Sequence, residues 1–311
     1  MSRNYQLGSR DMEIAARFAL NNQVHHGTLS YASAADISSR FNLFADWARQ
    51  HNARYLEYIT PELVKEYGQT LAQQVKDETI SPAYAQNRIS AINTVMNLAT
   101  KGHWKSVKPR KDCGIPSRHH IRTQAPELDR SPLNQALTQL QEHSPHSAAV
   151  IELCREFGLR SKEASLLDAK TALQQALTQN HIALSAGTKG GRYRTVPLTT
   201  DRQLDTLKRA ADHQAGSRSM IPDHKSWKTW RNTELRHARN TLKQHSGEKI
   251  RDLRAAYACE RYQHLTQQPA PVITGHLNTD KASNQKARHI IARELGHKRI
   301  DVTNSYLGGN R

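Results

Sequence analysis

Five side chains in the second half of the sequence have the types and the order that attack on a phosphodiester requires. They are Arg160, Lys189, Arg254, His297 and Tyr306. A guanidinium donates two parallel hydrogen bonds to a phosphate and keeps its charge at any working pH. A tyrosine hydroxyl can attack phosphorus, and a lysine on a glycine-flanked turn can protonate the leaving oxygen. The set predicts cleavage of a DNA strand through a covalent bond to the protein, a reaction that needs no metal and no other cofactor.

Each of these residues is a weak signal by itself. An arginine on a helix is usually solvated or ion-paired, a lysine in a glycine-rich turn is usually exposed, and a tyrosine near a C-terminus usually packs at the edge of a core. The prediction rests on the joint order of four short motifs. These are Gly158-Leu159-Arg160, Gly187-Thr188-Lys189-Gly190-Gly191, Arg251-Asp252-Leu253-Arg254, and Leu295-Gly296-His297 with Tyr306 nine residues later.

The composition favours a polyanionic partner. The 311 residues include 45 lysines and arginines against 28 acids, which gives a net charge of +17. Such a surface attracts nucleic acid. A protein that coats RNA or DNA without any catalytic site would have the same charge, and the basic stretch 226–243 with Trp227 and Trp230 would then stack on bases. We expect instead that these tryptophans face the core and that the basic side chains meet phosphates.

Other classes of protein are not indicated. Cys113, Cys154 and Cys259 are far apart and form no Cys-x-x-Cys pair, so neither a disulfide framework nor a thiolate zinc site is expected. The pairs His25-His26 and His119-His120 lack further ligands at metal-site spacing. There is no apolar run long enough to span a membrane and no signal peptide. The expected location is the bacterial cytoplasm, at the nucleoid.

Helical patterns fill residues 1–100 and predict an all-helical first domain. Apolar residues recur there at helical spacing, and serine or threonine followed by proline marks two helix starts. The expected helices are Ser9–Gln23, Ser33–His51, Thr60–Gln74 and Ser81–Ala99.

Residues 101–125 have the composition of an extended linker. The segment is rich in basic residues, contains prolines and has no apolar periodicity. A solvated tether is the plain interpretation. Because nearly all the charge has one sign, we favour a strap along a DNA backbone. The candidate DNA-binding residues are Lys101, Lys105, Lys108, Arg110, Lys111, Arg118 and Arg122, with Arg88 on the preceding helix.

Residues 126–311 predict a second domain of helices with one small antiparallel sheet. Strands Asn180–Ala186 and Arg192–Leu198 flank the glycine-rich turn that carries Lys189. The sequence after about Arg202 is mostly helical. The predicted fold class is therefore mainly α with a small antiparallel β-sheet (α+β). Three further helices are expected before the hairpin, over Pro132–Glu142, Ser147–Phe157 and Ser161–Leu167.

With these elements in place, the motifs resemble those of the tyrosine recombinases of the phage-integrase type. Residues 1–100 are similar to that family's core-binding domain, and residues 126–311 resemble its catalytic domain. The resemblance implies that Arg160, supported by Glu163, and Arg254 hold the scissile phosphate. It also implies that Lys189 is the general acid, that His297 belongs to the catalytic set, and that Tyr306 is the nucleophile.

The resemblance further implies a site-specific DNA recombinase, the integrase of a mobile element, that works through a 3′-phosphotyrosyl intermediate. Its partners would be double-stranded DNA recombination sites, on which four copies of an otherwise monomeric chain assemble. An excisionase or a host DNA-bending factor is a further expected partner. Type IB topoisomerases share the chemistry, but the likeness over the whole chain is to integrases.

The sequence departs from the family pattern in three places. The family's His-x-x-Arg motif begins here with Arg251, which cannot act as a base, so it assists electrostatically or another group takes the tyrosine proton. Residues 266–286 read as a loop insertion. Few residues follow Tyr306, which leaves little tail for docking onto a neighbour. A catalytically idle, sequence-specific DNA-binding protein derived from a recombinase is therefore the alternative.

Overall fold

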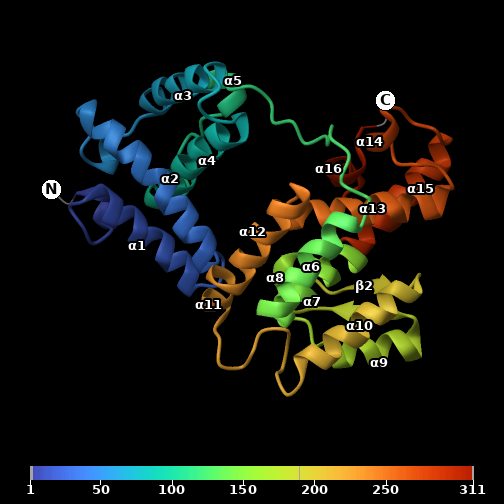
Figure 1. Ribbon diagram of the computed structural model, residues 1–311. Coiled ribbons are helices and arrows are strands. Elements are labelled where there is room, and N and C mark those ends of the chain that lie inside the picture. The colour runs from blue at the N-terminus through green and yellow to red at the C-terminus, as the bar shows by residue number, and fades with distance from the viewer. Residues whose placement is uncertain (1–2, 189, 310–311) are drawn as a thin grey trace. The chain divides into compact units, whose positions relative to one another are not determined.

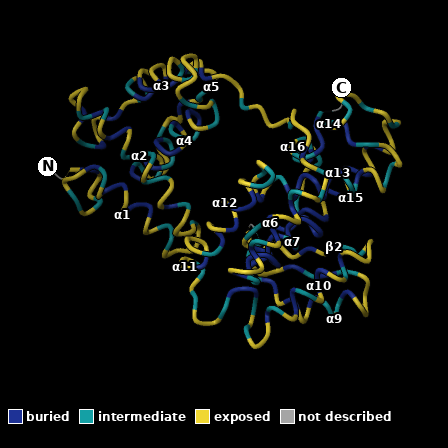
Figure 2. Tube along the Cα trace, viewed as in Figure 1, coloured by how far each residue is buried: buried dark blue, intermediate teal, exposed yellow. Residues whose placement is uncertain are grey.

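The computed structural model describes residues 3–188 and 190–309, which divide into two compact units, Met1–His119 and His120–Arg311. Figure 1 shows the elements of both units. Each unit has its own hydrophobic core, and Figure 2 marks the buried residues. Lys189, the predicted lysine of the hairpin turn, lies outside the described residues. Within the described ranges, no helix is long and apolar enough to cross a membrane.

The first unit is built from helices, as predicted. A short polar side chain caps each of its four long helices by accepting a hydrogen bond from the first turn. These caps are Asp11, Ser30, Thr60 and Ser81. Apolar faces meet around Phe41 and Phe44, whose side chains are fully buried. The elements are η1 (Asn4–Gln6), α1 (Met12–His25), α2 (Tyr31–Gln50), η2 (Leu56–Tyr58), α3 (Pro61–Lys76), α4 (Pro82–Ala99) and α5 (Pro109–Cys113).

The structure differs from the expected extended linker of residues 101–125. Val107, Cys113 and Ile115 are buried in the core of the first unit, and α5, which ends at Cys113, lies between Val107 and Ile115. Gly68 on α3 makes room for the Cys113 side chain, because a Cβ there would lie 2.2 Å from the sulfur. These scattered apolar residues anchor a segment whose charge suggested an extended chain. The contacts place residues up to His119 in the first unit.

In its described residues, the second unit is helical with one two-stranded sheet, which confirms the predicted fold class. Strands β1 and β2 pair antiparallel, with Ile182 opposite Val196 and Leu184 opposite Arg194. The elements are α6 (Ser131–His143), α7 (Pro145–Phe157), α8 (Ser161–Ser165), α9 (Ala169–Gln179), β1 (His181–Leu184), β2 (Arg194–Pro197), α10 (Asp201–Gln214), α11 (Trp227–Asn232), α12 (Glu234–Ser246), α13 (Ile250–Thr266), α14 (Pro271–Thr274), α15 (Lys281–Glu294), η3 (Ile300–Thr303) and α16 (Asn304–Leu307).

The tryptophan prediction is confirmed for Trp230, which is buried and donates a hydrogen bond of 3.0 Å from Nε1 to Ser165 Oγ. Trp227 is half-buried against the same core. The segment expected to be a loop insertion, residues 266–286, is partly helical. It contains α14 and the first turns of α15, which Asp280 caps by accepting a 2.9 Å hydrogen bond from Ser283 N. That N-cap was a helix signal in the sequence which the loop interpretation missed.

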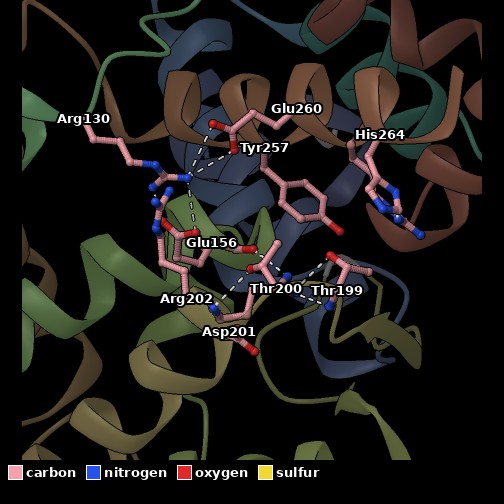
Figure 3. A pocket seen from close by; sticks show the side chains of 11 residues that line it. Arg130, Glu156, Thr199, Thr200, Asp201, Arg202, Tyr257, Glu260 and His264 are labelled. Atoms are coloured by element: carbon pink, nitrogen blue, oxygen red, sulfur yellow. Dashed lines mark hydrogen bonds and ion pairs between the residues drawn. The ribbon is translucent and has the colours of Figure 1, made fainter. Parts of the chain in front are cut away.

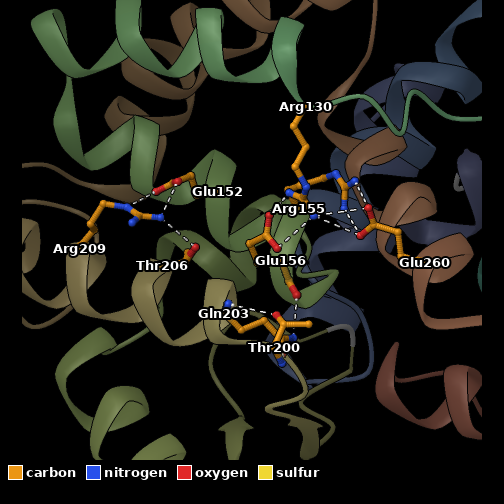
Figure 4. Close-up of polar contacts among 9 residues, drawn as sticks. All are labelled: Arg130, Glu152, Arg155, Glu156, Thr200, Gln203, Thr206, Arg209 and Glu260. Atoms are coloured by element: carbon orange, nitrogen blue, oxygen red, sulfur yellow. Dashed lines mark hydrogen bonds and ion pairs between the residues drawn. The ribbon is translucent and has the colours of Figure 1, made fainter. Parts of the chain in front are cut away.

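Ion pairs join α7, α13 and α6 inside the second unit (Figure 4). Arg155 on α7 is buried and donates two hydrogen bonds, of 2.7 and 2.6 Å, to the Glu260 carboxylate on α13. Arg130, beside α6, contacts both Glu260 and Glu156. Gln203 on α10 donates to the Glu156 carbonyl at 2.9 Å. The network fixes the C-terminal end of α7 relative to α13, and these two helices lead into the candidate site.

A cavity of about 430 Å³ lies beside this network, between the start of α10 and α13 (Figure 3). Its lining carries both charge signs. The cations are Arg130, Arg202 and Arg261, and the carboxylates are Glu156, Asp201 and Glu260. None of the predicted catalytic residues that the structure describes lines it.

Candidate active site

The centre of the site is the buried carboxylate of Glu163 on α8. Its side chain has 0% exposure. Glu163 Oε1 accepts a 2.6 Å hydrogen bond from Arg160 Nη1. Glu163 Oε2 accepts from the Arg160 backbone N–H at 2.7 Å and from Arg194 Nη2 at 2.7 Å. Arg254 Nη1 lies 3.9 Å from the same oxygen. One carboxylate therefore gathers the guanidinium groups of three arginines.

Arg254 is the most deeply held of these arginines. It lies on α13 with 3% of its side chain exposed. Its Nη1 donates to the carbonyl of Gly158 and its Nη2 to the carbonyl of Leu295. Its Nε donates to the Tyr306 hydroxyl oxygen at 3.2 Å. Burial lowers the pKa of Arg254, while the neighbouring Tyr306 acts in the opposite direction. A single side chain thus joins the end of α7, the end of α15 and the predicted nucleophile.

Gly158 makes this approach possible. It ends α7 in the left-handed region with φ +60°, and a Cβ there would lie 2.5 Å from the Tyr257 ring and 2.9 Å from the Leu295 side chain. Only glycine accepts both the conformation and the crowding without strain. The turn that follows places Arg160 in extended backbone immediately before α8.

Tyr306 lies on α16, half-buried against the core of the second unit. Its hydroxyl oxygen is 3.1 Å from Nε2 of His297. Because that oxygen already accepts from Arg254, its own proton is available to the imidazole nitrogen. The phenol is therefore placed between a cation that stabilises phenolate and a base that can remove the proton.

The electrostatics of the cluster keep His297 neutral. Burial lowers the pKa of His297 to about 4, and the positive charges of Arg254 and Arg160 act in the same direction. Arg194 on β2 adds to the lowering, and Glu163 opposes it. A neutral imidazole can accept a proton at physiological pH, which a protonated one cannot.

We expect the His297 imidazole of the DNA-free protein to remain neutral at pH 5. Its folded pKa lies below the ordinary value of 6.5, so the unfolded chain binds the proton more readily. Acidification from about 6.5 towards about 4 therefore favours unfolding. NMR titration of the imidazole nitrogens checks this, and a midpoint near 6.5 would contradict it. Arg160→Ala, which removes one facing cation, should raise the midpoint.

Comparison with protein families matches residues 116–260 to the family described as Integrase. This match spans 145 of the 311 residues, less than half of the chain. Together with the fold that the chain shares with solved recombinases, it supports the resemblance seen in the sequence. A search of the curated proteins finds no match.

Solved structures of several such proteins share the fold. A lambda integrase dimer bound to a COC′ core site is 16% identical, with a TM-score of 0.55 and coverage of 91% of this chain and 90% of the other. The Tn1549 transposon integrase in complex with transposon right end DNA is 12% identical, with a TM-score of 0.57 and 95% coverage of both chains. The XerH site-specific recombinase in a post-cleavage complex with a palindromic difH substrate is 15% identical, with a TM-score of 0.57 and coverage of 96% and 81%.

The structure brings most of the predicted catalytic residues together. Hydrogen bonds and ion pairs connect Arg160, Glu163, Arg254, His297 and Tyr306. Lys189 lies outside the described residues, but the structure describes the hairpin turn on both sides of it. A Cβ on Gly187 would lie 2.9 Å from the carbonyl oxygen of Lys162, so this part of the turn packs directly on α8.

Arg251 does not join the group. It is exposed in the first turn of α13, and within the described residues no hydrogen bond or ion pair connects it to Tyr306. Its neighbour Asp252 instead accepts a 2.6 Å hydrogen bond from Arg122 and a 3.0 Å hydrogen bond from the N–H of Lys249. His297, and not Arg251, lies next to the Tyr306 hydroxyl.

The candidate DNA-binding residues fall into two groups. Three of the arginines are engaged within the protein: Arg88 with Tyr67, Arg118 with Gln86, and Arg122 with Asp252. The others are exposed on the first unit. They are Lys101, Lys105, Lys108, Arg110 and Lys111.

A groove of about 440 Å³ on the first unit brings some of these side chains together. It is lined by Lys108, Arg110 and Lys111 with the polar residues Ser90 and Asn93 of α4. The groove therefore presents cations beside hydrogen-bonding groups, and the DNA-binding role of these residues stays a prediction.

Sequence reasoning missed Arg194. The residue lies on β2 and is 6% exposed, next to the buried Val196 on the inward face of the strand. The signal was present, because strand residues alternate between faces and Arg194 shares the face of Val196. A charged residue at an inward strand position indicates a buried ion pair, here with Glu163.

Proposed function

We propose that this chain is a site-specific DNA recombinase, the integrase of a mobile element, that cuts and rejoins DNA through a 3′-phosphotyrosyl intermediate. The observation that carries the proposal is the position of the Tyr306 hydroxyl. It lies 3.2 Å from Arg254 Nε and 3.1 Å from His297 Nε2, beside the arginine cluster around Glu163. A nucleophile, a base and phosphate-binding groups meet at one point.

The charge of the cluster suits the reaction. Three guanidinium groups surround one carboxylate, so the cluster carries an excess of positive charge. A phosphodiester gains negative charge as a fifth oxygen adds to phosphorus. Fixed cations in a site screened from water stabilise that charge without reorganising. Arg160, whose side chain is 29% exposed, is the arginine of the cluster that can reach a DNA phosphate.

In the proposed cleavage step, Tyr306 Oη bonds to phosphorus, and its proton passes to Nε2 of His297. The bond from phosphorus to the 5′ oxygen breaks, and Lys189 donates a proton to that oxygen, a role that rests on the family resemblance. The products are a 3′-phosphotyrosyl protein and a free 5′-hydroxyl end. Attack by a 5′-hydroxyl reverses the step, so rejoining needs no external energy source.

A trapping experiment on DNA of random sequence tests the proposal. The protein is incubated with random duplexes nicked at varied positions, so that cleavage close to a nick releases a short oligonucleotide and prevents rejoining. Adducts that survive SDS are recovered, their DNA is sequenced, and their peptides are analysed by mass spectrometry. We expect nucleotides on the peptide that contains Tyr306.

The same experiment distinguishes the proposed recombinase from the main alternative. The exposed Arg251, in the place of the family's usual histidine, is the observation that favours a catalytically idle DNA-binding protein. That protein would enrich a preferred sequence by binding but would form no adduct with it. Selective binding without any SDS-resistant product would therefore replace the recombinase proposal with this one.

We also propose assembly on DNA. One structure of the same fold is described as a lambda integrase tetramer bound to a Holliday junction. By analogy, this chain would be a monomer in isolation and a homotetramer on two paired double-stranded sites. An excisionase or a host DNA-bending factor is a further proposed partner.

A further inference from the structure

Arg194 is a buried cation with spare hydrogen-bond donors. Its Nη2 donates to Glu163 Oε2 at 2.7 Å. Its Nε and Nη1 are also buried, and no acceptor among the described residues takes a hydrogen bond from either. Burial lowers the pKa of Arg194 to about 10, although Glu163 opposes the effect, so the group stays charged at neutral pH. Unpaired donors on a buried charge cost stability, and they are uncommon in folded proteins.

Arg160, unlike Arg194, is partly exposed to solvent. It is the more exposed partner of Glu163, and among the described residues it alone donates to Oε1, from Nη1 at 2.6 Å. If Arg160 turns Nη1 to a DNA phosphate, this hydrogen bond breaks, and Glu163 Oε1 then needs another donor.

The spare donors of Arg194 lie next to that carboxylate. A Cβ on Gly296 would lie 3.1 Å from Arg194 Nε and 3.9 Å from Arg160 Nη1, so the two guanidinium groups approach the same point. Gly296 has φ +70° and no side chain, which leaves this space to the arginines. Because Nε and Nη1 of Arg194 are buried, a bound DNA strand is out of their reach, whereas the neighbouring Glu163 carboxylate is within it.

We propose that Arg194 is a positioning residue that holds Glu163 when Arg160 turns to the scissile phosphate. The hydrogen bond from Arg160 Nη1 to Glu163 Oε1 breaks, and one of the two spare Arg194 donors replaces it. Arg194 then holds both carboxylate oxygens, in the bidentate arrangement that guanidinium and carboxylate groups favour. The proposal rests on the proposed function, since it explains how the phosphate-binding arginine is released in a DNA-cleaving site.

The decisive variants change Arg194 alone and together with Glu163. Cleavage is measured in a single turnover on DNA recovered from the trapping experiment and already bound to the protein, with DNA affinity and thermal unfolding measured in parallel. Arg194→Met should slow cleavage by about 100-fold, the effect expected of a misplaced reacting group, with DNA affinity unchanged. Arg192→Met, on the same hairpin but exposed, is the matched control and should cleave like the wild type.

The double variant distinguishes positioning from structural support. In a Glu163→Gln background, the neutral amide no longer holds Arg160 by charge. Arg194→Met should then slow cleavage by less than about 10-fold, because the two changes act through one interaction. If Arg194 only supported the fold, Arg194→Met would slow cleavage by the same factor in the wild-type and Glu163→Gln backgrounds. This result would overturn the proposal.

A conservative variant keeps the test valid if Arg194→Met does not fold. Arg194→Lys retains the charge, but its ammonium group cannot match both carboxylate oxygens in plane. It should fold, bind DNA and still cleave slowly. Cleavage at the wild-type rate would overturn the role of Arg194 and leave the recombinase proposal intact. A wild-type protein that forms no adduct would overturn both.

Discussion

Tyr306→Phe is expected to abolish covalent attachment to DNA while leaving the fold unchanged. The substitution removes only the hydroxyl, which accepts a 3.2 Å hydrogen bond from Arg254 and lies 3.1 Å from His297. The ring keeps its packing against the core of the second unit. Loss of one partly buried hydrogen bond should change the free energy of unfolding by only about 1 kcal/mol. Without a nucleophile, adduct formation should fall by roughly four orders of magnitude or more.

The measurement is adduct formation on the trapped DNA sequences, with DNA affinity determined by titration. Tyr193→Phe is the matched control, because Tyr193 is 67% exposed on the hairpin and loses the same atom. The control should form adducts at the wild-type rate, and both variants should bind DNA as the wild type does. An undiminished adduct in Tyr306→Phe would show that another residue attacks phosphorus, and the peptide carrying the nucleotides would identify it.

The local elements of the site were predictable because each depends on residues close together in sequence. Gly158 ends a helix in the left-handed region, which only glycine adopts easily. The alternating apolar residues on either side of the glycine-rich turn predicted the two strands that β1 and β2 form. The family resemblance added which of these local motifs share one site.

The convergence of the side chains could not be derived from local patterns. Arg254 and Tyr306 are separated by 52 positions and come together only through the packing of α16 on α13. Arg194 was missed for a related reason: its importance comes from Glu163, which lies 31 positions away. The exposure of Arg251 likewise depends on where α13 meets the rest of the domain.

The basic segment after residue 100 shows a further limit. Its charge indicated an extended strap, yet Val107, Cys113 and Ile115 are buried in the first unit. Isolated apolar residues without periodicity give no signal in a search for helices or strands. They can still anchor an irregular segment when a neighbouring surface, here at Gly68, has room for them.

Arg254→Met is expected to destabilise the protein as well as to stop cleavage, whereas Arg160→Met should mainly stop cleavage. Arg254 is almost completely buried and donates to the carbonyls of Gly158 and Leu295. Its removal leaves both carbonyls without that donor and removes a cation near Glu163. Breaking such a buried charged network typically lowers the free energy of unfolding by about 3–5 kcal/mol.

Arg160 differs because its side chain is 29% exposed and because Glu163 keeps Arg194 when Arg160 is lost. Arg160→Met should change the free energy of unfolding by about 1 kcal/mol while slowing cleavage by roughly 100- to 1,000-fold, as loss of a phosphate-stabilising donor does. Urea unfolding and single-turnover cleavage, measured on both variants, check the contrast. Equal stability of the two variants would mean that Arg254 does not hold α7, α13 and α15 together. The activity lost in Arg254→Met would then have to be assigned to its contact with Tyr306.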